Sequence, residues 1–148
     1  MPFPGKQAAP PPRHKPEGNA RRRARWLLSA FYMVAGLAHL LRPAGFLAIM
    51  PPWVPWSAQV VALTGAAEIA GAVGLHIPRL RRAAGAGLAL YALCVWPANF
   101  HHAISGIPLG GVDLGWRYHG PRLALQPVII WWALWASRVI DWPFLRRA

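Results

Sequence analysis

A single carboxylate stands near the middle of a long apolar stretch of the chain. The stretch covers residues 58–77, AQVVALTGAAEIAGAVGLHI, and Glu68 is its one acidic residue. About twenty apolar residues in a helix match the ~30 Å hydrocarbon core of a bilayer. An ionisable group at the centre of such a helix costs about 2.5–3.5 kcal/mol on insertion. We therefore expect Glu68 to have a partner, a bound proton or a function.

Other apolar stretches also carry isolated polar side chains. Helical rise predicts that these side chains lie at similar depths in the membrane. If successive helices alternate in direction, His39, Asn99 and Gln126 lie toward the same ends of their helices, with Glu68 deeper. We predict a polar cluster in the outer half of a helical membrane domain, formed by His39, Glu68, Asn99, Gln126 and Arg122. The alternative is that each group bonds to neighbouring backbone and only stabilises packing.

Helical periodicity predicts one small or polar face on each of four helices. The four inward faces are Ser29, Tyr32, Gly36 and His39; Thr64, Glu68, Gly71 and Leu75; Gly87, Tyr91, Asn99 and His102; and Arg122, Gln126, Ala133 and Ser137. On the last helix, we predict that Leu125, Val128, Trp132 and Trp135 face lipid. Close packing at the small residues is typical of membrane helices.

The composition favours an integral membrane protein. Hydrophobic residues make up 55% of the 148 residues and charged residues 14%, well below the ~25% of soluble domains. The net charge of +12 falls in clusters between apolar stretches rather than on one soluble face, so we do not expect a nucleic-acid partner. A single cysteine, Cys94, excludes an intrachain disulfide.

The chain divides into a tail and one membrane domain. Residues 1–25 are rich in proline and arginine and lack apolar periodicity, which predicts a disordered tail. Residues 26–148 form the predicted domain, an all-α, polytopic four-helix transmembrane bundle. The predicted spans are residues 26–41, 58–77, 83–105 and 122–140. Residues 42–57 form a proline- and tryptophan-rich interfacial loop, and residues 106–121 a glycine-rich loop.

Arginine and lysine predict the orientation. With four spans, the tail, the turn at 79–82 and the C-terminal end lie on one side of the membrane. That side holds Lys6, Arg13, Lys15, Arg21, Arg22, Arg23, Arg25, Arg79, Arg81, Arg82, Arg138, Arg146 and Arg147. Only Arg42, Arg117 and Arg122 lie on the other. The positive-inside rule then places both termini in the cytoplasm and the protein in the inner (plasma) membrane.

Five motifs in order resemble the DoxX-like family of small four-helix membrane proteins. They are Gly36-x-x-His39 with Pro43, Phe46 and MPPWVP; Gly65-x-x-Glu68-x-x-Gly71-x-x-Gly74-Leu75-x-x-Pro78; Arg81-Arg82-x-Ala84; Pro97-Ala98-Asn99; and Arg122-Leu123-x-Leu125-Gln126 with Trp131-Trp132. The resemblance implies four membrane helices, and some relatives are linked to quinone-coupled oxidation or membrane redox complexes. Ala124 replaces a frequent proline, and His101 and His102 replace a more apolar pair.

The sequence predicts a structural or accessory subunit of a membrane complex and assigns no catalytic residue. One alternative is a quinone-linked redox subunit, in which His39 and Glu68 exchange protons with a quinone and Arg122 anchors an anionic substrate. Another is a proton-coupled transporter that uses Glu68. No flavin, nucleotide, iron–sulfur or metal motif is evident. A redox role would need a soluble oxidoreductase or another membrane subunit as partner. The sequence is also compatible with a homo-oligomer.

Overall fold

A computed structural model describes residues 18–108 and 110–143 of the chain. All elements found there are α-helices, which confirms the predicted all-α class. In chain order they are α1 (Asn19–Leu41), α2 (Pro43–Ala48), α3 (Ser57–Gly74), α4 (Arg81–Ser105) and α5 (Gly115–Ala136). Pro43 begins α2, where its missing N–H is not needed by the helix.

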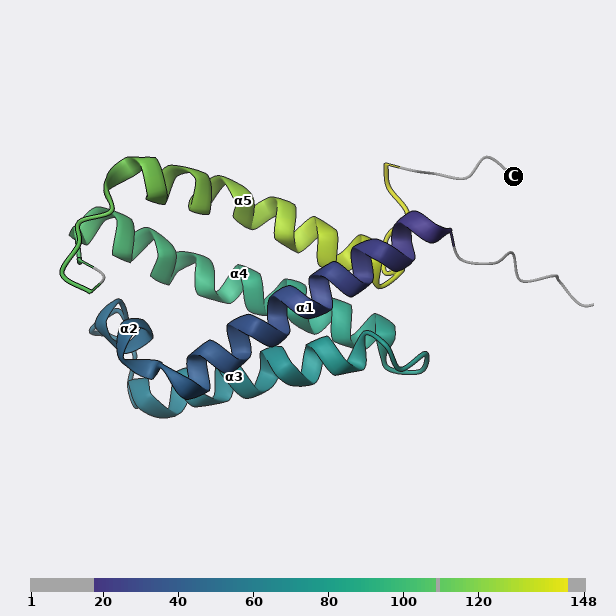
Figure 1. The fold of residues 1–148 in the computed structure, drawn as a ribbon, viewed down its shortest axis with the longest axis horizontal. Helices are drawn as coiled ribbons and strands as arrows, with labels where there is room; N and C mark the ends of the chain where they lie inside the picture. Colours follow the sequence, from purple (N-terminus) through teal and green to yellow (C-terminus); the bar gives the residue numbers. More distant parts are fainter. Residues whose placement is uncertain (1–17, 109, 144–148) are drawn as a thin grey trace, which may run out of the picture.

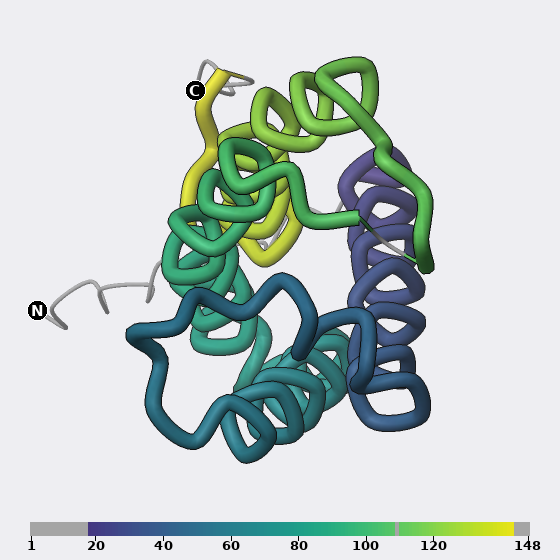
Figure 2. The backbone as a smooth tube through the Cα atoms, turned by 90° about the vertical axis from the view of Figure 1, so that its left-hand side faces the viewer, coloured from purple at the N-terminus to yellow at the C-terminus, as the bar shows by residue number. Residues whose placement is uncertain are grey.

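The long helices pack as two pairs, α1 with α3 and α4 with α5 (Figure 1). Contacts between α3 and α4 and between α1 and α5 join the pairs. Seen along the helices, α1, α3, α4 and α5 occupy four corners in chain order (Figure 2). The pairs converge at the end where α1 begins and α5 ends, and they diverge at the end where α2 lies (Figure 1). We call these the basic end and the α2 end.

The buried apolar core lies in the half of the molecule toward the basic end. Small and large side chains alternate across the helices there: Leu28, Tyr32, Ala72, Leu75, Leu88, Ala89, Ala133 and Ala136. Gly85 permits the closest approach, because a Cβ at this position would lie 1.9 Å from Ser137 Oγ. Gly85 thus lets α4 approach the end of α5 closely. Between α3 and α4 an open groove of about 380 Å³ remains, lined by small residues such as Gly71, Gly74 and Gly87.

Another close approach sets the spacing of α1 and α3. A Cβ on Gly36 would lie 2.6 Å from the carbonyl oxygen of Gly65, and a Cβ on Gly65 would lie 2.7 Å from His39 Cβ. The two backbones therefore touch where the helices cross. His39 lies against Gly65 of the other helix, and Glu68 lies against Gly36, with its Cβ 3.2 Å from a Cβ placed there. The close approach therefore leaves the two side chains within reach of each other.

All four long helices begin earlier than the sequence predicted, and two of them, α1 and α5, begin seven residues earlier. The helix predicted from residue 26 begins at Asn19, because alanine and arginine favour helix and Arg25 is buried against the rest of the molecule. The helix predicted from residue 122 begins at Gly115, where Asp113 Oδ1 accepts a hydrogen bond from the Gly115 N–H at 3.0 Å. The loop predicted for residues 106–121 is correspondingly shorter. The tail prediction for residues 1–17 lies outside the described residues.

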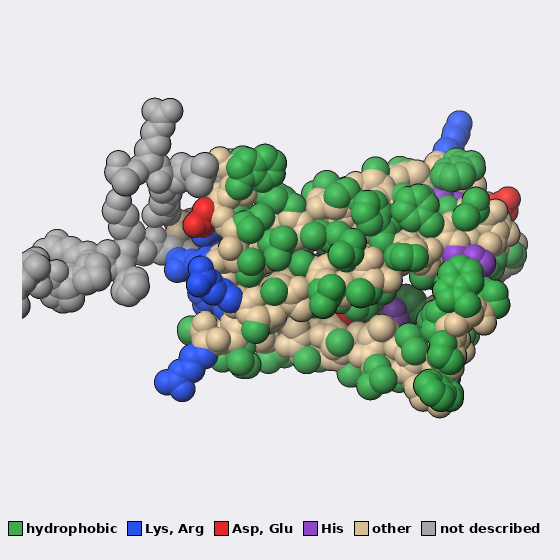
Figure 3. Space-filling view, turned by 180° about the vertical axis from the view of Figure 1, so that it is seen from behind, with side chains coloured by type: hydrophobic (Ala, Val, Ile, Leu, Met, Phe, Trp, Pro, Cys, Tyr) green, Lys and Arg blue, Asp and Glu red, His purple; other side chains and the backbone are tan. Residues whose placement is uncertain are grey.

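Three helices in the described part of the chain, α1, α3 and α4, are long and apolar enough to cross a membrane. This is the pattern of a membrane protein. The long sides of the molecule are largely apolar, and arginine side chains gather at the basic end (Figure 3). Helix α5 is as long, but its first turns carry Arg117, His119 and Arg122.

Candidate functional site

A cavity of about 610 Å³ opens between the two helix pairs toward the α2 end. Figure 3 shows this face hollowed, with a histidine side chain in the hollow. Most of the walls are apolar. The apolar and small lining residues are Phe31, Phe46, Ile49, Met50, Val54, Val60, Val61, Ala92, Cys94, Val95, Ala98, Pro121, Leu125 and Ile129. The polar ones are Tyr32, His39, Thr64, Glu68, Tyr91, Asn99, Tyr118, Arg122 and Gln126.

His39 and Glu68 meet at the wall formed by α1 and α3. The Nδ1 atom of His39 lies 3.0 Å from Glu68 Oε2 and 2.9 Å from the carbonyl oxygen of Ala35. Nδ1 is aligned to donate to Ala35, whereas Oε2 receives no well-aligned hydrogen bond. A nitrogen placed between two acceptors must carry a hydrogen. The contact with Glu68 is therefore mainly electrostatic, and the second ring nitrogen is the one left to exchange protons.

Neighbouring side chains hold this pair in place. Glu68 is 3% exposed, and the His39 ring stacks on Phe46 with 3.7 Å between ring centroids. The hydroxyl of Tyr91, from α4, interacts with both Glu68 and Thr64. The carboxylate is thus approached from three helices, α1, α3 and α4, and its charge is shared with hydroxyl and imidazole groups rather than with water.

A second polar group joins α4 to α5. Asn99 Nδ2 donates to Gln126 Oε1 at 3.4 Å, and Gln126 Nε2 donates to the carbonyl of Ala92. Both side chains are less than a tenth exposed. The two amides use much of their hydrogen-bonding capacity on each other and on backbone, which stabilises the helix pair.

Arg122 lies on the same face of α5, one turn before Gln126. Its Nη1 donates to Nδ1 of His102 at 2.9 Å, and its guanidinium lies 5.7 Å above the Tyr118 ring. His102 is fully buried, and its Nε2 lies 3.0 Å from the carbonyl oxygen of Ile107. The arginine is therefore anchored by a histidine on α4 and an aromatic ring on α5.

The structure brings all five sequence-predicted residues, His39, Glu68, Asn99, Gln126 and Arg122, to the wall of one cavity. They form three separate contacts around it rather than one connected network. Tyr32, Thr64 and Tyr91 were on predicted inward faces but were not assigned to the cluster. Tyr118 was missed because it lay in a predicted loop.

Two of the predicted helix faces are wrong at single residues. Gly87 was predicted to face inward and is instead exposed with no atom within 4 Å of a Cβ placed on it. Trp132 was predicted to face lipid but is half-buried against the core, and its indole N–H donates to the Ala24 carbonyl at 3.0 Å. The prediction assumed that one face of each helix points inward along its whole length. Because the helices cross at an angle, the inward face changes along the helix.

Among residues 18–108 and 110–143, no group of three or more His, Cys, Asp or Glu side chains is placed to hold a metal ion. A family model described as a domain of unknown function (DUF8561) matches residues 28–137. No curated protein and no solved structure matches the chain. The matched range includes every residue that lines the cavity.

Proposed function

The chain belongs to the DUF8561 family, and we propose that it is a multi-pass membrane protein that binds a small membrane-soluble molecule. The observation that supports this most directly is the cavity of about 610 Å³, with apolar walls and a few polar groups. Binding sites for small molecules commonly have this size and this mixture of side chains. The cavity also opens between helix pairs, where a molecule dissolved in the bilayer has access.

We place the four long helices across the inner (plasma) membrane as a bundle with both termini in the cytoplasm. The gathering of arginine side chains at the basic end supports this orientation. The cavity then lies in the outer half of the membrane. A reporter fused after Ala148 tests the orientation, since we expect activity only from a cytoplasmic reporter. Activity only outside the cytoplasm would overturn it.

In this proposal the protein is an accessory subunit that holds a lipid-soluble molecule for a partner. The alternative is that the polar groups only stabilise helix packing. It fits Asn99 and Gln126, which hydrogen-bond to each other and to backbone. It fits Glu68 less well, because Glu68 lines the cavity and contacts the side chains of His39 and Tyr91 rather than backbone. The alternative ligand is a quinone, which would exchange protons with His39 and Glu68 beside the apolar walls. Electrons would come from a partner oxidoreductase.

The test compares two identical substitutions on α4. Ala98→Phe places a ring in the cavity, whereas Ala86→Phe places the same ring on the exposed side of the helix. We expect mass spectrometry of the purified protein to find a lipid-soluble molecule with the wild type and with Ala86→Phe. The Ala98→Phe protein should carry about tenfold less. Equal amounts in all three would contradict binding in the cavity.

A further inference from the structure

Arg122 is a cation at the wall of a largely apolar cavity. Its side chain is half-buried, and its described polar contact is with His102, 2.9 Å away. A guanidinium has five N–H donors, so this contact leaves donors for another group. The charge of Arg122 thus raises the question of which anion it faces.

His102 does not supply that anion, and its hydrogen bonds indicate a neutral ring. The carbonyl oxygen of Ile107 lies 3.0 Å from Nε2 and can only accept, so Nε2 must carry a hydrogen. Arg122 can only donate, so Nδ1 must be the bare, accepting nitrogen. Both contacts are satisfied by one neutral tautomer. The positive charge of Arg122 is therefore positioned by His102 but not neutralised by it.

The described carboxylates are also committed elsewhere. Among the residues that line the cavity, Glu68 is the one acidic side chain, and it lies 3.0 Å from His39. Asp113 accepts a hydrogen bond from the Gly115 backbone, and Asp141 pairs with Arg21 at the basic end. Within the described part of the chain, Arg122 has no carboxylate within ion-pair distance. An unpaired charge beside apolar walls is unfavourable.

We propose that the molecule bound in the cavity is an anionic amphiphile, a long-chain carboxylate whose acid group pairs with Arg122. The acid would receive the guanidinium hydrogen bonds that His102 leaves free, and such charge-assisted bonds are among the strongest in proteins. The chain would lie along the apolar wall, past Leu125 and Ile129 on the same helix. This inference rests on the proposed function, because it names the chemical class of the ligand at that site.

The test measures binding of a fluorescent long-chain carboxylate and of its methyl ester to the full-length protein in nanodiscs. The ester keeps the chain and removes the charge. Arg122→Gln removes the cation, Arg122→Lys keeps it, and Arg117→Gln removes an exposed cation from the same helix. We expect Arg122→Gln to weaken carboxylate binding about 10- to 100-fold and to leave ester binding unchanged. Arg122→Lys should retain part of the affinity, and Arg117→Gln all of it.

The other outcomes separate the two proposals. If the carboxylate and the ester bind wild type equally, or if Arg122→Gln weakens both equally, the cavity binds apolar molecules and the inference about the anion is wrong. If carboxylate binding falls as much in Arg117→Gln, surface charge rather than Arg122 attracts the probe. If neither probe binds, or if Ala98→Phe does not reduce binding of either one, binding in the cavity itself fails.

Discussion

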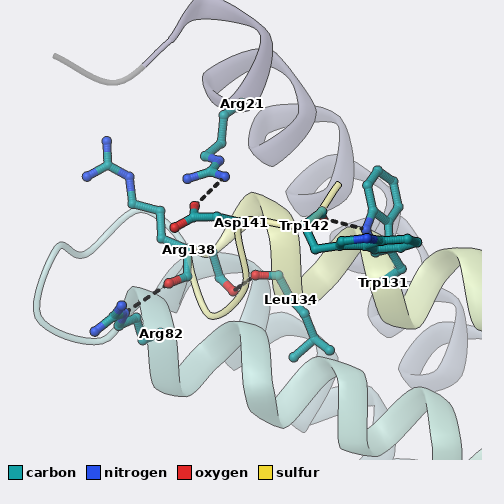
Figure 4. Close-up of polar contacts among 8 residues, drawn as sticks. Arg21, Arg82, Trp131, Leu134, Arg138, Asp141 and Trp142 are labelled. Atoms are coloured by element: carbon teal, nitrogen blue, oxygen red, sulfur yellow. Dashed lines mark hydrogen bonds and ion pairs between the residues drawn. The ribbon is translucent and has the colours of Figure 1, made fainter. Parts of the chain in front are cut away.

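At the basic end, several polar side chains bond to backbone carbonyls of neighbouring elements, whereas toward the α2 end Glu68 and Arg122 line a cavity. Arg82 donates to the Arg138 carbonyl at 3.0 Å, and Trp131 donates to the Trp142 carbonyl at 3.1 Å (Figure 4). At the other end, Glu68 and Arg122 line open space. The same helices therefore form a closed half and a hollow half.

The difference shows how a small membrane domain can separate stability from binding. Alanine and glycine in the closed half let the helices meet around Leu28, Leu75 and Leu88. The basic end also concentrates positive charge: burial and the nearby Arg25 and Arg81 lower the pKa of His76, which stands between α3 and α4. In the hollow half, larger separation leaves polar groups accessible to a ligand. Substitutions in the closed half should therefore change stability, and those in the hollow half should change binding.

The largest effect should come from Gly85. Gly85→Ala places a Cβ 1.9 Å from Ser137 Oγ and 2.9 Å from the Ala133 carbonyl oxygen, and such overpacking costs about 1–3 kcal/mol. Gly87→Ala is the control, because no atom lies within 4 Å of its Cβ. It should be neutral or stabilise by up to about 1 kcal/mol through helix propensity. Thermal unfolding of the purified proteins measures both, and equal effects would contradict a tightly closed half.

Glu68→Gln, in the hollow half, should change ligand binding but not stability. The amide keeps the shape of Glu68 but loses its electrostatic contact with His39. We expect an unfolding free energy within about 1 kcal/mol of wild type and up to about tenfold more co-purified ligand, because the amide removes a negative charge that repels an anion in the same cavity. Mass spectrometry and thermal unfolding on the same sample provide the two readings. Reduced folding yield with unchanged ligand per molecule would support the packing-only interpretation.

Trp132→Phe should show a smaller effect in the closed half. It removes the indole N–H that donates to the Ala24 carbonyl at 3.0 Å, which costs about 1 kcal/mol. Ligand content per folded molecule should stay at the wild-type value. Trp116→Phe, at a position 66% exposed, is the matched control and should leave the unfolding temperature unchanged. A loss of ligand in Trp132→Phe would mean that the halves are coupled.

The smallest effect should come from the ion pair between Arg21 Nη2 and Asp141 Oδ1, which are 2.7 Å apart. Asp141→Asn should cost less than about 1 kcal/mol, because the Asp141 side chain is 66% exposed and water screens the pair. The difference in unfolding free energy from wild type should vanish at high salt. A larger, salt-independent loss would show that this contact holds the basic end closed.

The apolar stretches and the inward position of Glu68 could be predicted from the sequence, because both follow from length and periodicity. The beginning of α5 at Gly115 could not be predicted, because Gly115 and Pro121 are typical of loops. The hydrogen bond from the Gly115 N–H to Asp113 at the helix start is visible only in the structure. The contact between His39 and Glu68 required the pairing of α1 with α3. Separate helix patterns do not reveal that Gly36 meets Gly65, so the sequence predicted that Glu68 lies deeper than His39 but not that the two side chains touch.

The crossing at Gly36 and Gly65 also has a mechanical consequence. Because the backbones touch there, the positions of His39 and Glu68 depend on the angle between α1 and α3 rather than on flexible side chains. Membrane helices adjust their tilt to bilayer thickness. A change in tilt about this crossing would alter the distance between the imidazole and the carboxylate. The His39–Glu68 contact would then respond to the thickness of the surrounding lipid as well as to a bound molecule.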